Sequence, residues 1–340
     1  MKEKKHSGLK IIAMIVVVIM LSYTVIALLP RPLNYKQENG MRKDGELPIL
    51  IAHGGGNREF PDNTLEAFYN AYDADPRVMM ETDVSITKDG VVILSHDTSI
   101  DRKSNGTGKI AELNYTDLIA NEVDFGYLNE MKDGVRVGEP KHFVSEDGEE
   151  KYPTDVPYPD GVSPRHETVF LATTLEELLV AFPENRINVE IKQDGAVGKR
   201  CLYAVLDLLE RHDAFDRVVL ASFHDTVYSE FVRMNAAGEV PEGFMFSPST
   251  GGVVKFFLLA STGLDVFYTD PITVLQIPME EYGINLATAE LVNTAHRHNL
   301  AVHYWTIDDE DDMRWLIDIG ADGIMTNYPH RLEAVLEAEK

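Results

Sequence analysis

The sequence has very little cysteine. Of its 340 residues only Cys201 carries a thiol, so no disulfide can close within the chain. Neither a metal-binding nor a redox cysteine motif surrounds this position. Cys201 lies in an amphipathic segment, which predicts a buried structural thiol.

Positive charge is also scarce. The chain has 31 Lys and Arg residues against 56 Asp and Glu, a formal net charge of -25. So acidic a surface argues against nucleic acid or anionic lipid as an electrostatic partner. A dinucleotide-binding role is disfavoured as well, because no Gly-x-Gly-x-x-Gly follows the first predicted strand.

A long apolar run occurs only near the N-terminus, at Ile11–Leu29. An uncharged run of this length crosses a bilayer as a helix. The preceding residues are basic, which predicts a cytoplasmic flank at 1–10 and a translocated remainder. A cleaved signal peptide is the alternative, but no A-x-A-like cleavage site follows the run. We therefore predict an uncleaved anchor at 11–29 and a polar linker at 30–46.

From residue 47 to about 335, β-rich runs alternate with helical runs. The predicted strands are Pro48–His53, Val78–Ile86, Arg186–Lys192, Arg217–Phe223, Glu242–Phe246, Val266–Thr269, Ala301–Ile307 and Asp322–Thr326. The predicted helices include Asn63–Asp75, Thr174–Phe182, Gly198–His212, Thr226–Asn235 and Asp309–Ile319. Eight such units predict an α/β fold, a TIM (β/α)8 barrel, with a doubly wound open sheet as the alternative.

Two segments depart from the alternation. Residues 98–170 are polar and rich in Asp, Glu, Gly and Pro, too long for an ordinary loop. They predict an insertion after the second strand, either a small cap over the site or a partly disordered segment. Residues 251–260 are unusually apolar but too short to span a membrane. They predict a core-packed barrel helix, or alternatively an apolar surface near the membrane that admits acyl chains.

Polar residues at strand ends are the candidate site residues, because TIM-barrel active sites lie at the carboxyl ends of the strands. His53 ends the first strand, and Glu81 and Asp83 lie two apart on the second, so they share a face. Glu190 and Lys192 have the same spacing on the third strand. Three carboxylates on adjacent strands predict an oxygen-ligand site for one divalent cation, Mg²⁺ or Ca²⁺.

A second histidine is expected to reach the same end of the barrel. The turn residues at 87–90 are followed by an apolar run and then by Ser95-His96-Asp97. This pattern predicts a short hairpin that returns His96 toward the three carboxylates.

Four stretches resemble the motifs of glycerophosphodiester phosphodiesterases, in the same order. They are IAHGGGNREFPDNTLEAF (51–68), METDVSITKDGVVILSHD (80–97), NVEIK (188–192) and WTIDDEDDMRWLIDIGADGIMTNYP (305–329). The resemblance covers residues 48–330 apart from the insertion. It implies a TIM barrel with an insertion at this place, and hydrolysis of glycerophosphodiesters to sn-glycerol 3-phosphate and an alcohol. Glycerophosphodiesters and lysophospholipids are the implied substrates, and the anchor predicts that this activity is extracytoplasmic, at the cell membrane.

The resemblance also implies roles for individual residues. Glu81, Asp83 and Glu190 would hold the cation, and His53 and His96 would act as general acid and base. Lys192 would contact the phosphate. The fourth stretch would contribute Trp305, which would line the substrate end of the pocket.

The chain departs from the family pattern beside the first histidine, where Gly54 stands in place of an Arg that commonly binds phosphate. Backbone N–H groups of Gly54–Gly56 could form an anion nest, or the Arg58 side chain could reach the phosphate. Two other functions therefore remain: a phospholipase D-like phosphodiesterase acting on lysophospholipids, and a catalytically silent phosphodiester-binding barrel.

Overall fold

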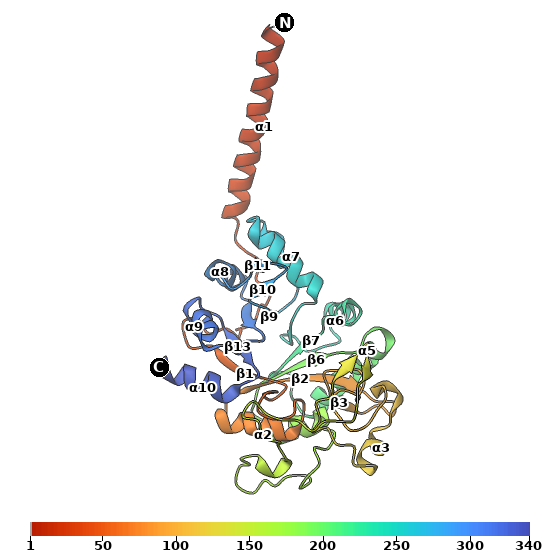
Figure 1. The fold of residues 1–340 in the computed structure, drawn as a ribbon. Coiled ribbons are helices and arrows are strands. Elements are labelled where there is room, and N and C mark those ends of the chain that lie inside the picture. The colour runs from red at the N-terminus through yellow and green to blue at the C-terminus, as the bar shows by residue number, and fades with distance from the viewer. Residues whose placement is uncertain (1) are drawn as a thin grey trace.

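The computed structural model describes residues 2–340, with side chains from Lys10 onward, so Met1 of the predicted basic flank lies outside it. Helix α1 (Lys2–Leu28) projects away from a single α/β domain (Figure 1). Its Lys10–Leu28 portion has no buried residue and, by length and composition, can span a membrane. A signal sequence near an N-terminus has the same length and composition.

Eight parallel strands form the predicted barrel. Their spatial order is β8-β7-β6-β2-β1-β13-β12-β9. The strands are β1 (Ile49–His53), β2 (Met79–Ile86), β6 (Ile187–Ile191), β7 (Val218–Ala221), β8 (Met245–Phe246), β9 (Val274–Ile277), β12 (Ala301–Tyr304) and β13 (Gly323–Thr326). The two end strands meet where the Thr273 N–H donates to the Phe246 carbonyl at 2.9 Å. This contact brings the sheet round into a nearly closed barrel and excludes the doubly wound open sheet.

The strands are apolar on both faces because helices cover the outside and side chains fill the inside. Every residue of β2 is buried. Met41, Ile51, Met79, Val219 and Met325 belong to one buried cluster that fills the barrel interior. Large apolar side chains therefore hold the barrel together below the level at which the polar strand-end residues begin.

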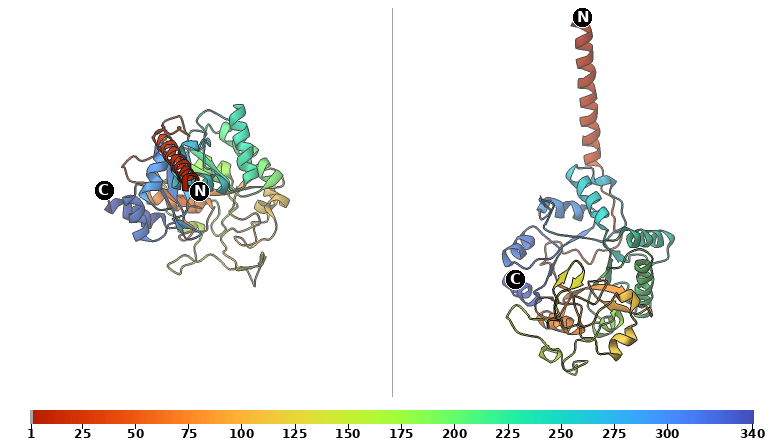
Figure 2. Two further views of the ribbon diagram at one scale, coloured as in Figure 1. Left: turned by 90° about the horizontal axis from the view of Figure 1, so that it is seen from above. Right: turned by 45° about the vertical axis from the view of Figure 1, so that its right-hand side comes forward.

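Eight helices of the described chain surround this barrel (Figure 2). They are α2 (Leu65–Ala74), α4 (Leu175–Ala181), α5 (Gly195–Arg211), α6 (Asp225–Ala237), α7 (Thr250–Ser261), α8 (Ala289–Arg297), α9 (Glu310–Asp318) and α10 (Pro329–Ala338). Local sequence fixes several of their starts. The Thr64 hydroxyl accepts from the Ala67 N–H at the start of α2, and Thr174 and Glu177 form a capping box on α4.

One predicted strand was wrong. The segment Val266–Thr269 is not a strand, and the short helix η3 (Asp265–Phe267) precedes the sixth barrel strand, which lies at β9. The run is apolar because Tyr268 packs edge-on against the ring of Phe256, 5.0 Å between centroids. A short apolar run does not by itself distinguish a strand from a buried turn.

The insertion is folded. It follows the predicted hairpin strand β3 (Val92–Leu94), which pairs antiparallel with β2. Its elements are η1 (Ile110–Glu112), α3 (Tyr115–Ala120), β4 (Met131–Lys132), β5 (Val135–Arg136) and η2 (Pro153–Asp155). Phe125, Val156 and Phe170 form a small core with Phe60 of the barrel. Although the insertion is polar in composition, it contains enough apolar residues to pack as an ordered segment against the domain.

The segment 30–46 contacts the domain at several places. The Asn39 amide donates to the carbonyls of Thr273 and Asn299 at 3.0 and 2.8 Å, and the Met41 side chain is completely buried. Thr273 and Asn299 each lie just before a barrel strand. The segment predicted as a polar linker is therefore a strap across the amino-terminal ends of the strands.

Candidate active site

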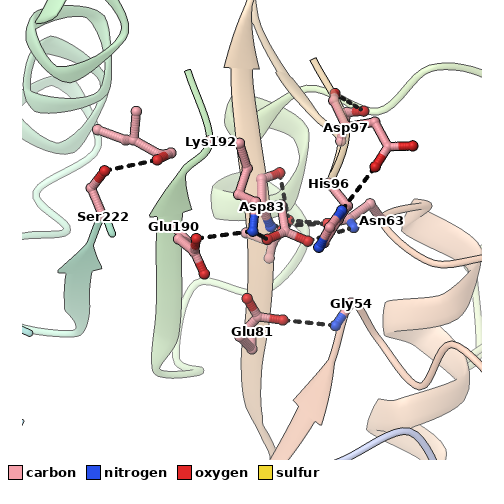
Figure 3. Close-up of polar contacts among 12 residues, drawn as sticks. Gly54, Asn63, Glu81, Asp83, His96, Asp97, Glu190, Lys192 and Ser222 are labelled. Carbon is pink, nitrogen blue, oxygen red and sulfur yellow. Dashed lines mark hydrogen bonds and ion pairs between the residues drawn. The ribbon is translucent and has the colours of Figure 1, made fainter. Parts of the chain in front are cut away.

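The strand register brings the predicted cation ligands together (Figure 3). His53 of β1 lies opposite Glu81 of β2, and Asp83 lies opposite Glu190 of β6. Glu81, Asp83 and Glu190 each offer an oxygen atom within 4.8 Å of the others. This spacing and an all-oxygen donor set fit one hard divalent cation.

The electrostatics of the cluster also favour a cation. Burial, followed by the charges of Asp83 and Glu190, raises the pKa of Glu81 well above its ordinary value of 4.5. Lys192 Nζ lies 2.9 Å from Glu190 Oε1 and 3.4 Å from Asp83 Oδ1. Burial opposes charge on Lys192, but these carboxylates outweigh it and raise the lysine pKa. One ammonium group cannot balance three buried carboxylates, which leaves room for a divalent charge.

Two neighbours fix the directions of the carboxylates. The Asn63 amide donates to Asp83 Oδ2 at 3.1 Å, while its oxygen accepts from the Asp83 N–H at 3.0 Å. The Gly54 N–H donates to Glu81 Oε2 at 2.9 Å. Both contacts come from the loop after β1, so this loop orients two of the three candidate ligands.

The residues considered as substitutes for the missing arginine are engaged in other contacts or exposed. The Gly54 N–H is occupied by Glu81, and the N–H groups of Gly55 and Gly56 donate to the carbonyls of Ala52 and His53. Arg58 is exposed and lines neither cavity at the site. The structure therefore brings neither a free anion nest nor the Arg58 side chain to this centre.

His53 is held through one ring nitrogen. The Asn327 amide donates Nδ2–H to Asp308 Oδ2 at 2.6 Å, which turns its own oxygen toward His53 Nδ1 at 2.7 Å. Nδ1 must then carry the proton of the neutral ring, and Nε2 keeps its lone pair. This arrangement suits a general base.

His96 has a different partner. Its Nδ1 lies 2.9 Å from Asp97 Oδ1 (Figure 3), and this hydrogen bond raises the pKa of His96. Burial alone would raise the pKa of Asp97, but hydrogen bonds from His96 and Arg102 outweigh it and hold that pKa well below its usual range. An imidazole that keeps its proton to higher pH suits a general acid.

Two cavities meet at these histidines. The first, about 140 Å³, contains all three carboxylates, Lys192 and both imidazoles, and is walled by Phe223 and Trp305. The second, about 400 Å³, is shared by His53, His96 and Asp83 and is lined by Arg102 and Lys103 of the insertion. Lys103 forms an ion pair with the buried Asp62. Two positively charged side chains, Arg102 and Lys103, therefore lie beside the centre, although the residue after His53 is glycine and carries no charge.

Five residues of the candidate active site were not predicted from the sequence. Asn63, Asp308 and Asn327 lie inside the quoted motifs, so only their roles as orienting groups were overlooked. Arg102 and Lys103 lie in the insertion without any motif around them. Nothing in their local sequence indicates that the insertion folds back onto the barrel mouth.

Comparisons with known proteins identify the family of the chain. Residues 53–331 match the Glycerophosphoryl diester phosphodiesterase family. A glycerophosphodiester phosphodiesterase from Caldanaerobacter subterraneus is 24% identical over 286 residues, covering 84% of this chain and 96% of the relative. Lysophospholipase D GDPD1 from Rattus norvegicus is 24% identical over 321 residues, covering 87% and 88%.

Solved structures share the fold. An Oleispira antarctica phosphodiesterase, solved in complex with the product sn-glycerol-3-phosphate, superimposes with a TM-score of 0.59 at 19% identity. The superposition covers 86% of this chain and 97% of the other. Because the family match spans most of the chain and includes every element of the site, the chain belongs to the glycerophosphoryl diester phosphodiesterase family and is a phosphoric diester hydrolase.

Proposed function

We propose that this enzyme hydrolyses glycerophosphodiesters to sn-glycerol 3-phosphate and an alcohol by acid–base catalysis between His53 and His96. The observation that carries the proposal is the unlike setting of the two imidazoles beside the three carboxylates. The His53 Nδ1 faces the amide oxygen of Asn327, whereas the His96 Nδ1 faces the carboxylate of Asp97. An amide partner on one imidazole and a carboxylate partner on the other suit the two histidines to different roles in proton transfer.

The two histidines divide the proton transfers. His53 Nε2 removes a proton from the attacking oxygen, which belongs to water or to the glycerol hydroxyl beside the phosphate. His96 gives a proton to the alcohol oxygen as its bond to phosphorus breaks. Each such transfer contributes about 10²–10⁴-fold to the rate.

Charge on the phosphate is met from two sides. Lys192 approaches from β6, and Arg102 and Lys103 approach from the insertion across the second cavity. These two insertion residues play the role of the arginine that commonly follows the first histidine in the family, where this chain has Gly54. Glu81, Asp83 and Glu190 would hold a divalent cation, which when bound would supply Lewis-acid stabilisation of the phosphoryl oxygens.

A direct assay tests the proposal. The full-length protein in lipid nanodiscs is given glycerophosphocholine or glycerophosphoglycerol, and released sn-glycerol 3-phosphate is measured with EDTA and then with added Ca²⁺ or Mg²⁺. We expect turnover that EDTA abolishes and one of the cations restores. Turnover that survives EDTA would refute the cation requirement, and no release with any cation would favour the catalytically silent barrel.

We propose further that α1 remains attached as a membrane anchor and that the domain is extracytoplasmic. The support is the basic segment before the apolar run of α1. Added protease should digest the domain in right-side-out vesicles and spare it in inverted ones. The intact mass of the purified protein should include α1, and a shorter mass beginning near residue 30 would show cleavage instead.

A further inference from the structure

An apolar cavity of about 520 Å³ adjoins the active site. Its walls come mainly from one face of α7, the segments after β7 and β9, and the hairpin of β10 (Glu280–Glu281) and β11 (Ile284–Asn285). Phe223, Gln276 and Trp305 line both this cavity and the one that contains the three carboxylates. The two cavities are therefore neighbours that share a wall, one polar and one apolar.

The Phe223–Trp305 pair forms much of that wall. Their ring centroids are 5.8 Å apart, and Lys192 Nζ lies 5.9 Å from the Phe223 ring. The Trp305 Nε1–H is buried and has no hydrogen-bond acceptor within the described chain. A ligand with a phosphate at Lys192 and an apolar tail beyond Phe223 would use both cavities and could satisfy this donor.

The outer rim of the apolar cavity consists of large apolar side chains that are exposed to solvent. Val254 and Leu258 of α7 are 51% and 57% exposed, and Tyr282 and Ile284 of the hairpin are 94% and 45% exposed. Large apolar side chains gathered at one exposed rim mark a surface that meets an apolar partner. The net charge of -25 opposes electrostatic attraction to anionic lipid, so the contact with such a partner must be apolar.

The same edge of the domain carries the anchor. The Tyr23 hydroxyl of α1 donates to the Thr262 carbonyl at the end of α7, at 2.9 Å. Arg31, just after α1, forms two hydrogen bonds with Asp265 in the next turn, at 2.7 and 2.9 Å. Figures 1 and 2 show α7 as the element directly beneath α1. A membrane that contains α1 would therefore lie close to the rim.

We propose that the apolar cavity binds the single acyl chain of a lysophospholipid, which enters from the membrane between α7 and the β10–β11 hairpin. The inference rests on the proposed function and names its substrate class. Water oxygen bonds to phosphorus as the bond from phosphorus to the head-group alcohol breaks. The alcohol leaves with the proton from His96, and lysophosphatidate keeps the acyl chain. A cavity of this size suits a ligand with one chain.

The dependence of rate on chain length tests the cavity. The full-length protein in nanodiscs is given lysophosphatidylcholines of six, eight and ten acyl carbons as monomers, and each rate is divided by that enzyme's rate on glycerophosphocholine. We expect kcat/KM to rise about twofold to fourfold per methylene. Val254→Asp should abolish this slope, and Val180→Asp, at an exposed valine of α4, should keep it.

Two outcomes would separate this inference from the proposed function. Turnover of glycerophosphocholine with no dependence on chain length would overturn the acyl cavity and leave the phosphodiesterase intact. If glycerophosphocholine is not turned over at all, binding decides the matter. The Trp315→Phe variant leaves Trp305 as the sole tryptophan, and monomeric decylphosphocholine should shift its emission to the blue. Val254→Asp should weaken this binding about tenfold, and no shift would refute the cavity.

The orientation toward the membrane has its own test. Tyr282→Trp is made in a chain whose native tryptophans are replaced by Phe, and Val180→Trp in the same background is the control. In vesicles containing brominated phospholipids, we expect quenching of the tryptophan at 282 and little at 180. Equal quenching at both positions, or none at 282, would overturn entry from the membrane.

Discussion

Two buried acidic groups lie near opposite ends of the barrel, and their surroundings differ. At the carboxyl ends of the strands, Glu81, Asp83 and Glu190 share one nearby ammonium group, that of Lys192. Near the amino-terminal ends, Asp265 is 1% exposed and meets two hydrogen bonds from Arg31. His298 Nε2 also lies near this carboxylate, 3.2 Å from Asp265 Oδ2.

The pKa shifts of the two groups have opposite signs. Burial and like charges raise the pKa of Glu81 and of Glu190. Burial pushes the pKa of Asp265 upward as well, but the hydrogen bonds from Arg31 and His298 outweigh it and lower that pKa. Asp265 is thus neutralised by the chain itself and holds the strap in place. The carboxylates of the barrel mouth are left unbalanced, which is expected of a site that binds a charge from outside.

The largest expected contrast is in activity. Asp83→Asn removes a candidate cation ligand, and several kcal/mol of transition-state stabilisation should go with it, about a thousandfold in kcat/KM. Asp265→Asn is the matched control and should leave kcat/KM on glycerophosphocholine within about twofold, because it touches no group near the phosphate. Similar losses in both variants would mean that the two acidic groups do not differ in the way described.

For stability we expect the opposite order, because the group around Asp265 contributes more to folding than to activity. Arg31→Met leaves Asp265 buried with weaker partners, which should cost about 3 kcal/mol and lower the Tm by about 6–12 °C. Thermal unfolding followed by circular dichroism measures this. Arg211→Met removes an exposed pair with Glu176 and should leave the Tm nearly unchanged, because solvent screens exposed ion pairs. A Tm in Arg31→Met equal to that of Arg211→Met would show that the strap is not held by this ion pair.

Adding a divalent cation should stabilise the folded protein through the carboxylates of the barrel mouth and not through Asp265. Glu81 binds protons more tightly when folded, so without metal the folded state loses stability as pH rises above about 4.5. Ca²⁺ or Mg²⁺ at one fixed concentration, about a hundred times its Kd at neutral pH, should add about 2.7 kcal/mol of stability at that pH. At that fixed concentration the increment in Tm should grow as the pH rises above about 4.5, because fewer bound protons then compete with the cation, and it should vanish in Glu81→Gln. An increment independent of pH would contradict this linkage.

The insertion cations should act on substrate binding. Lys103→Met removes one positive charge near the phosphate position and should raise KM about tenfold, with a smaller change in kcat. The same change strands the buried Asp62, so Lys103→Met with Asp62→Asn separates binding from folding. KM should stay high in the double variant while the Tm recovers. Lys109→Met, at an exposed lysine of the same insertion, should leave KM unchanged.

The smallest expected effect is a shift in pH dependence. The hydrogen bond to Asp97 raises the pKa of His96, so the acid form persists to higher pH. Asp97→Asn removes the negative partner and should move the basic limb of the kcat/KM profile to lower pH. The acidic limb should stay in place, because His53 is held by Asn327 instead. Movement of both limbs together would show that the two histidines do not have separate roles.

The sequence by itself determined the barrel, its insertion and the central residues of the site. Alternating patterns predict eight strand and helix units, and the two-residue spacing of Glu81 and Asp83 places both side chains on one face of β2. These features are local, because a strand's period and a helix cap depend on residues a few positions apart. The misplaced sixth strand shows the limit, since an apolar run at 266–269 reads equally well as a strand or a buried turn.

Only the tertiary structure decided how distant segments meet. The pairing of Arg31 with Asp265 spans 234 positions, and Arg102 and Lys103 reach the barrel mouth only because the insertion folds back. The apolar cavity likewise combines α7, the β10–β11 hairpin and Trp305. Such contacts depend on the closure of the barrel and the packing of long connections, and no local period in the chain encodes them.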